Sequence, residues 1–151
     1  MAELNSLNYS KINVLNPSEK VEPGDSNGKL KCLYDEYTLP GAIVAANDEI
    51  LIQGLPKGAK IHEVVIEAPA LGGSCQLSVG LKDNGVDSED ADAFIPDTSF
   101  ASAAIKKMSD DAGNAGMFKV LGAETIPFIK VVAASAATAG TIKMAIYFTN
   151  D

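Results

Sequence analysis

His62 is the only side chain of this sequence that ordinarily titrates near neutral pH, so a search for acid–base catalysis starts there. It lies in the run IHEVVI at residues 61–66, whose β-branched residues are typical of a strand, and no Ser or Cys nucleophile motif is nearby. The sequence contains no GxSxG, HExxH, Walker or GxGxxG motif. We therefore interpret His62 as a strand histidine and expect no enzyme activity, no catalytic residues and no cofactor.

The densest group of potential oxygen ligands is the acidic segment KDNGVDSEDAD at residues 82–92. Calcium binds six to eight oxygens, and such a segment can supply them. The weak calcium candidates are Asp83, Asp87, Asp90 and Asp92. The residue order departs from that of an EF-hand, because Gly85 comes too early and no Glu closes the loop at the required distance. We favour a solvated acidic loop over a calcium site.

Cys32 and Cys75 are the only two cysteines, and each lies in an apolar, strand-like run. A chain of this size inside a cell does not need a disulfide, so we expect two buried free thiols, with a disulfide as the alternative. One His and two distant Cys do not have the spacing of a zinc site.

The net charge of −8, from 12 basic and 20 acidic residues, repels phosphate backbones and argues against direct binding of nucleic acid. The first residues, MAELNSLNYSK, lack the pattern of a signal peptide, and no run of 18 apolar residues is present. We expect no membrane partner and a location in a cytoplasm or in a particle assembled there.

From residue 29 onward, short apolar and β-branched runs alternate with Gly, Pro, Asn and Asp, as in strands joined by turns. The expected strands are residues 29–39, 43–44, 49–55, 59–68, 74–81, 117–121, 125–134 and 140–149. The one helical candidate, a turn or two within residues 97–108, fits irregular structure equally well. With no long helices, the sequence predicts one all-β domain over residues 29–151. We expect an antiparallel β-sandwich of the jelly-roll type.

Residues 1–28 differ from the rest, being rich in Asn, Ser, Glu, Pro and Gly. The residues of this segment that could be buried are Leu4, Leu7, Tyr9, Ile12, Val14 and Leu15. We interpret it as an extended N-terminal arm that becomes ordered against a neighbouring subunit or a partner. A passive terminus is an equal alternative.

A series of short motifs between residues 33 and 149 resembles the head decoration, or capsid cement, proteins of tailed phages, which have a jelly-roll-like fold. The motifs are YTLPG at 37–41, NDEILI at 47–52, LPKGAKI at 55–61, LSVGLKD at 77–83, FIP at 94–96 and AGTIKMAIYFT at 139–149. Each motif alone is little more than a turn between strands, and the resemblance rests on their order and spacing.

The resemblance implies a non-enzymatic virion protein that binds the assembled major capsid shell at subunit junctions, on the capsid exterior, after synthesis in the host cytoplasm. A small β domain that bridges shell subunits opposes their separation. A homo-oligomer, dimer or trimer, would strengthen attachment through multivalency.

Two other functions stay open. The first is a receptor- or glycan-binding virion domain of jelly-roll type, which would be expected to display aromatic rings. Trp is absent, and Tyr34, Tyr37 and Tyr147 lie inside expected strands. The second is an enzyme without a recognisable motif.

Overall fold

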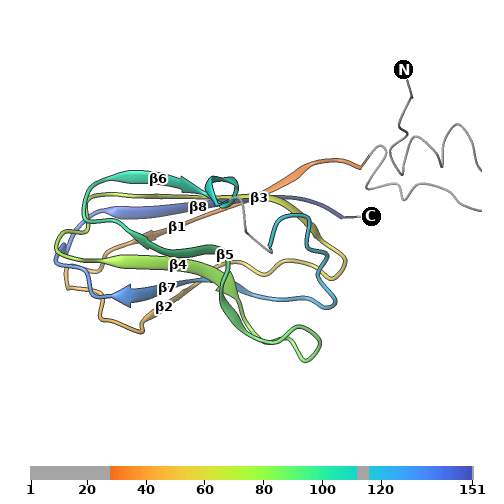
Figure 1. Cartoon of the computed structure of the whole chain (residues 1–151), viewed down its shortest axis with the longest axis horizontal. Coiled ribbons are helices and arrows are strands. Elements are labelled where there is room, and N and C mark those ends of the chain that lie inside the picture. The colour runs from red at the N-terminus through yellow and green to blue at the C-terminus, as the bar shows by residue number, and fades with distance from the viewer. Residues whose placement is uncertain (1–27, 112–115, 151) are drawn as a thin grey trace, which may run out of the picture.

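The computed structural model describes residues 28–111 and 116–150, which form a sandwich of two four-stranded antiparallel sheets (Figure 1). Sheet A contains β1 (Lys31–Thr38), β8 (Thr141–Thr149), β3 (Lys60–Ala68) and β6 (Ala104–Lys107), in that order. Sheet B contains β2 (Glu49–Leu51), β7 (Pro127–Ala133), β4 (Gln76–Leu81) and β5 (Asp90–Ser99). Eight antiparallel strands in these two orders make a jelly roll, so the predicted fold class is confirmed.

Strand β8 shows why the sequence folds in this way. Ile142, Met144, Ile146 and Phe148 alternate with more polar residues, and all four side chains are buried in the core. Because successive side chains of a strand point to opposite faces, this strand buries one face and leaves the other outside. It is an interior strand of sheet A, paired with β1 on one side and with β3 on the other.

The core between the sheets is mainly aliphatic, in keeping with an aromatic content of only 6%, and its fully buried residues include Leu55, Ile61 and Leu77. Two aromatic rings, Phe94 and Phe100, are also completely buried in it. Phe94 lies in the middle of β5, and Phe100 directly follows this strand. Aromatic residues therefore contribute more to the core than their low frequency suggests.

The turns with Pro and Gly lie where the sequence places them. Gly41 and Gly58 have φ angles of +81° and +80°, a region that favours glycine. Gly58 lies in the connection between β2 and β3, in the predicted LPKGAKI turn. These glycines fix the points at which the chain reverses between sheets.

Several expected elements are wrong. Residues 90–99 and 104–107 were not expected as strands but form β5 and β6. Of the range 97–108, only Met108 is helical, as the first residue of the short 3₁₀ helix η1 (Met108–Asp110). Residues 43–44 form no strand, and residues 117–121 contain only an isolated bridge from Val120 to Lys60. The physical reason for the error at β5 is that this strand lies at the edge of its sheet, where Pro96 and register breaks are tolerated.

The first and last described residues lie at the same end of the sandwich. Lys31 near the start of the described chain pairs with Phe148 near its end, and the two ends lie on the same side of the sandwich (Figure 1). No helix within the described residues has the length and apolar character needed to cross a bilayer.

Candidate functional site

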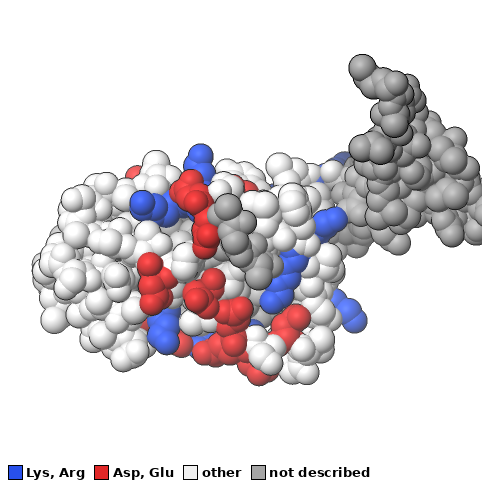
Figure 2. All heavy atoms as spheres, viewed as in Figure 1, with Lys and Arg blue, Asp and Glu red and all other residues white. Residues whose placement is uncertain are grey.

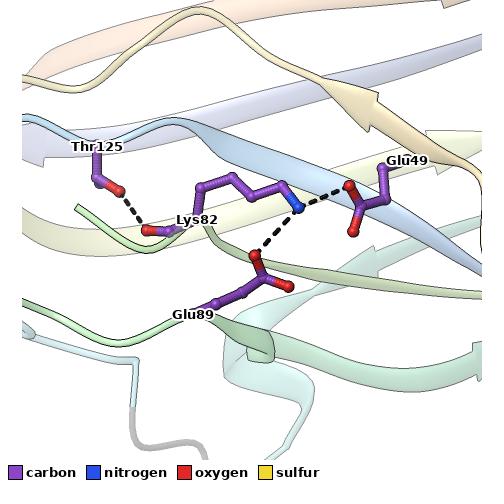
Figure 3. Close-up of polar contacts among 4 residues, drawn as sticks. All are labelled: Glu49, Lys82, Glu89 and Thr125. Carbon is purple, nitrogen blue, oxygen red and sulfur yellow. Dashed lines mark hydrogen bonds and ion pairs between the residues drawn. The ribbon is translucent and has the colours of Figure 1, made fainter. Parts of the chain in front are cut away.

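A polar cluster on the outside of sheet B joins three segments that are distant in sequence (Figure 3). The Nζ atom of Lys82 lies 2.6 Å from Oε2 of Glu49 in β2 and 3.1 Å from Oε2 of Glu89. The carbonyl oxygen of Lys82 accepts a hydrogen bond of 2.9 Å from the hydroxyl of Thr125. The hydrogen bond to Glu49 is the main cause that raises the pKa of Lys82. We call these four residues the Lys82 cluster.

Phe128 lies directly beneath this cluster. The neighbouring residue Ile129 belongs to the core, so Phe128 points to the outer face of sheet B, yet its side chain is 0% exposed. The Nζ atom of Lys82 lies 4.3 Å from the centre of the Phe128 ring, which is a cation–π contact. The Lys82 cluster therefore covers an outward-facing aromatic ring and holds the loop after β4 against β2.

Sequence reasoning did not find this cluster. Lys82 and Glu49 are 33 residues apart, and their contact depends on the pairing of β2 and β4 with opposite sides of β7. The only available signal was the position of Lys82 at the start of the acidic segment.

The four calcium candidates are divided between a loop and a strand. Asp83 and Asp87 lie in the loop after β4, whereas Asp90 and Asp92 belong to β5, so residues 82–92 are not one loop as we expected. The reason is that β5 begins at Asp90 and pairs there with Leu81.

The carboxylates of these candidates accept hydrogen bonds from nearby protein groups. Oδ1 of Asp83 accepts one of 2.8 Å from the N–H of Gly85, and Oδ2 of Asp87 accepts one of 3.1 Å from the amide of Asn84 and one of 3.0 Å from the N–H of Gly122. In residues 28–111 and 116–150, no group of three or more His, Cys, Asp or Glu is arranged to hold a metal ion. The structure thus does not bring the four candidates together as one ligand set.

Two of these carboxyl groups have altered proton affinities. Hydrogen bonds from the Asn84 amide and then from the Gly122 N–H lower the pKa of Asp87. A hydrogen bond with Asp90, followed by partial desolvation, raises the pKa of Asp92. The hydrogen bond with Asp90 thus favours the protonated form of Asp92, whereas the hydrogen bonds to Asp87 favour its anion and tie its loop to the segment around Gly122.

The charge of the domain is unevenly distributed between the two sheets. Sheet B and the loop before β5 carry seven carboxylates and two lysines: Glu49, Asp83, Asp87, Glu89, Asp90, Asp92 and Asp97 against Lys82 and Lys130. The strands of sheet A carry four carboxylates and five lysines: Asp35, Glu36, Glu63 and Glu67 against Lys31, Lys60, Lys106, Lys107 and Lys143. Figure 2 shows acidic side chains gathered over the layer of β4 and β5. One side of the sandwich is strongly acidic, and the other is close to neutral.

His62 lies in β3, as predicted, at a β-bulge between Ile61 and Glu63. Its Nε2 atom is 3.0 Å from the hydroxyl oxygen of Thr149, and its ring packs edge-on against Phe118 with centroids 5.9 Å apart. These contacts join the ends of β3 and β8 to the segment around Phe118. They give His62 a structural role that accounts for its place in the strand.

The two cysteines differ in exposure. Both are free thiols, and Cys75 is completely buried, which raises its pKa. The expectation that Cys32 is also buried is wrong, because Cys32 is exposed. The next residue, Leu33, faces the core from β1, so strand alternation turns the Cys32 side chain outward.

The predicted arm lies almost entirely outside the described residues, which begin at Gly28. The same holds for Leu4, Leu7, Tyr9, Ile12, Val14 and Leu15. Their proposed role in partner binding stays a prediction. Of the three tyrosines in expected strands, Tyr34 is 57% exposed on β1, whereas Tyr37 and Tyr147 are half-buried.

No protein-family model and no curated protein matches this sequence. Solved structures do match it, and three of them come from phage capsids. A chain in the capsid of Ralstonia phage GP4 aligns with a TM-score of 0.67 and 19% identity, covering 84% of this chain and 88% of that chain. A chain in the capsid asymmetric unit of cyanophage Pam1 aligns with a TM-score of 0.63 and 20% identity, covering 92% and 99% of the two chains.

A third match is a chain in the acidic stable capsid structure of Helicobacter pylori bacteriophage KHP30, with a TM-score of 0.55, 16% identity, and coverage of 81% and 89%. At these identities the likeness concerns the fold. In each case the alignment covers most of both chains, so the similarity extends over the whole jelly roll. This chain has the fold of small chains found in phage capsid structures.

Proposed function

We propose that this chain is a structural protein of a phage virion that decorates the capsid. In this proposal it binds the assembled major capsid shell from outside, at junctions between shell subunits, and stabilises the shell. The observation that carries the proposal is the near-complete mutual coverage with a chain of the Pam1 capsid, 92% and 99%. A match of this kind indicates that the two chains are of similar size.

The order of the sequence motifs supports the finer assignment to decoration. Three of the motifs correspond to structural features of the sandwich: the turns at Gly41 and Gly58, and the central strand β8. These features position the loops at the ends of the sandwich. A rigid domain of this type can contact two shell subunits at once, which favours the assembled over the dissociated shell by mass action.

The proposal is a non-enzymatic one. The contacts of His62 are with a buried threonine hydroxyl and a phenylalanine ring, which support a role in stability. The acidic side of the sandwich also suits a protein that does not contact packaged DNA, because it would repel phosphates.

The test uses phage heads that lack this protein, prepared by deleting its gene in the source phage. The purified full-length chain should co-sediment with these heads, saturate at a fixed ratio to the major capsid protein, and raise the temperature at which the heads break open. Absence of binding to heads would overturn the proposal.

The abundance of the chain in purified virions separates decoration from receptor binding. A decoration protein occupies sites over the whole shell, so its copy number should be comparable with that of the major capsid protein. A few copies per virion, together with loss of adsorption when the gene is deleted, would instead indicate the receptor-binding alternative.

A further inference from the structure

The outer face of sheet A combines exposed apolar side chains with nearly balanced charge. Strand pairing places Tyr34 of β1, Ala145 of β8 and Val65 of β3 side by side across this face. Tyr147 lies in the neighbouring row, and Ile105 lies on β6. These side chains alternate with those that face the core, so they point away from the sandwich.

Exposed apolar side chains are concentrated on and beside this sheet. Nine large apolar residues of the described chain are exposed, and five of them belong to sheet A or its ends. They are Leu30, Tyr34, Ile105, Phe118 and Val120, with exposed fractions of 56–63%. Leu30 directly precedes β1, and Val120 bridges to Lys60 of β3. Concentration of this kind marks an interaction surface.

The outer face of sheet A has hollows as well as projecting side chains. A hollow of about 90 Å³ lies between Tyr34, Val65, Lys143 and Ala145, where the small side chain of Ala145 leaves space. A larger depression of about 450 Å³ lies beside it and is bordered by Ile105. Projecting side chains and hollows therefore occur on the same face, as a self-complementary interface requires.

We propose that this face pairs with the same face of a second copy of the chain, around a twofold axis. The distribution of charge over the two sheets favours a second copy of the chain as the partner of this face. Two chains of net charge −8 repel each other, but strand alternation places equal numbers of carboxylates and lysines on the outer face of sheet A, whereas sheet B and its loop carry seven carboxylates and two lysines. The outward charges of sheet A are Glu36, Glu63 and Glu67 against Lys60, Lys107 and Lys143. Sheet A is thus the side on which two copies can approach closely.

The charged residues at the centre of this face can also form ion pairs between the two copies. Lys143 lies between Glu36 of β1 and Glu67 of β3 in one row, and its Nζ atom is 3.8 Å from Oε1 of Glu67. A twofold operation places an equivalent row on the partner, so that each lysine faces a row with two carboxylates.

The area of the face agrees with a weak but specific dimer. The strands β1, β8, β3 and β6 have 8, 9, 9 and 4 residues. At about 3.3 Å per residue and about 4.8 Å between strands, they cover about 480 Å² in each copy. Two copies together bury about 950 Å², which lies in the range of weak interfaces, below about 1,200 Å². We therefore expect weak association and test it at micromolar concentrations. The inference does not depend on the proposed capsid function, because it concerns the chain alone in solution.

The test is sedimentation equilibrium of the full-length chain from about 1 to about 100 µM, the range of weak interfaces. The wild-type chain should form dimers in this range. Ile105→Lys and Ala145→Lys each place two added charges in the dimer interface and should weaken association at least tenfold. The matched control is Ile43→Lys, since Ile43 has the same exposed fraction as Ile105, 59%, but lies between β1 and β2. It should dimerise like the wild type.

Thermal melting of each variant shows whether it is folded, and a folded Ile105→Lys that still dimerises like wild type overturns the proposal. A monomeric wild-type chain also overturns it. If that monomer loses binding to phage heads on Ile105→Lys but not on Ile43→Lys, the face binds the shell. If the full-length chain is monomeric but the chain without residues 1–26 is dimeric, the chain's own arm covers the face. Equal loss of dimer in all three variants would show that the interface is elsewhere.

Discussion

Gly80 of β4 lies close against the backbone of β5. A Cβ atom added at Gly80 would lie 2.5 Å from the carbonyl carbon of Ala91 and 2.6 Å from its Cα, and it would also overlap the carbonyl oxygen of Asp90. All three atoms belong to the backbone, so no change of side-chain rotamer can relieve the overlap. In Gly80→Ala the start of β5 must therefore move away from β4.

The cost of this movement can be estimated from the behaviour of overpacked sites. Inserting a methyl group into a tightly packed site typically destabilises a protein by about 1–3 kcal/mol, and overlaps with backbone favour the upper end, about 3 kcal/mol. For a protein of this size each kcal/mol lowers the Tm by about 2–4 °C, so Gly80→Ala should melt about 6–12 °C below wild type. Circular dichroism at increasing temperature measures this difference.

Gly54→Ala is the matched control. A Cβ atom at Gly54 would come no closer than 3.6 Å to any neighbour, so this variant should melt within a few degrees of wild type, about 1 kcal/mol or less in stability. Equal Tm values for Gly80→Ala and Gly54→Ala would refute the close approach of β5 to β4 and with it the described path of residues 90–93.

Four further predictions concern charge, titration, thiols and the arm. Lys82→Met removes two partly exposed ion pairs and a cation–π contact, each contributing at most about 1 kcal/mol, so urea denaturation should show a loss of about 1–2 kcal/mol, and the loss should be smaller in high salt. A lowered pKa in the folded state means that ionised Asp87 stabilises the protein above the ordinary Asp pKa and loses this effect as pH falls through its lowered pKa. Asp87→Ala should therefore destabilise the protein at neutral pH and flatten the acid side of its pH–stability curve; an unchanged curve would contradict this reasoning. Cys32 should react with a thiol reagent in the native protein and Cys75 only after unfolding, so one thiol per chain before denaturation and two after it are expected. Deleting residues 1–26 should leave the melting of the sandwich nearly unchanged but weaken oligomerisation or attachment to heads; full retention of both would make the arm a passive tail.

The strands with strict alternation could be predicted from the sequence, and β8 is the clearest case. Its four apolar residues at every second position predict one buried face, and all four are buried. Strand β5 could not be found in this way. Its sequence, DADAFIPDTS, contains three Asp and one Pro, and its buried residues Ala93, Phe94 and Ile95 are consecutive because the register with β4 breaks on both sides of Val79. Periodicity fails where pairing is irregular.

The face to which a strand residue points is also hard to predict when both faces carry apolar side chains. In β1, Cys32 and Tyr34 alternate with Leu33, and the sequence alone does not show which set is buried. The answer depends on the pairing of β1 with β8, more than 100 residues away. The exposed thiol and the apolar outer face of sheet A follow from this pairing, so neither could be read from the β1 sequence.

Phe128 and Tyr34 differ in how far they are covered on the outer faces of the two sheets. Both rings point outward from a sheet, but Phe128 is completely buried beneath Lys82, whereas Tyr34 is 57% exposed. On sheet B, Lys82 of the loop after β4 lies over the ring and pairs with the carboxylates of Glu49 and Glu89, and the acidic charge of this side repels other acidic chains. On sheet A no described segment covers the corresponding row of Tyr34, Val65 and Ala145. A fold that covers the outward ring on one face and leaves the apolar row of the other open has one side suited to solvent and one suited to a protein partner.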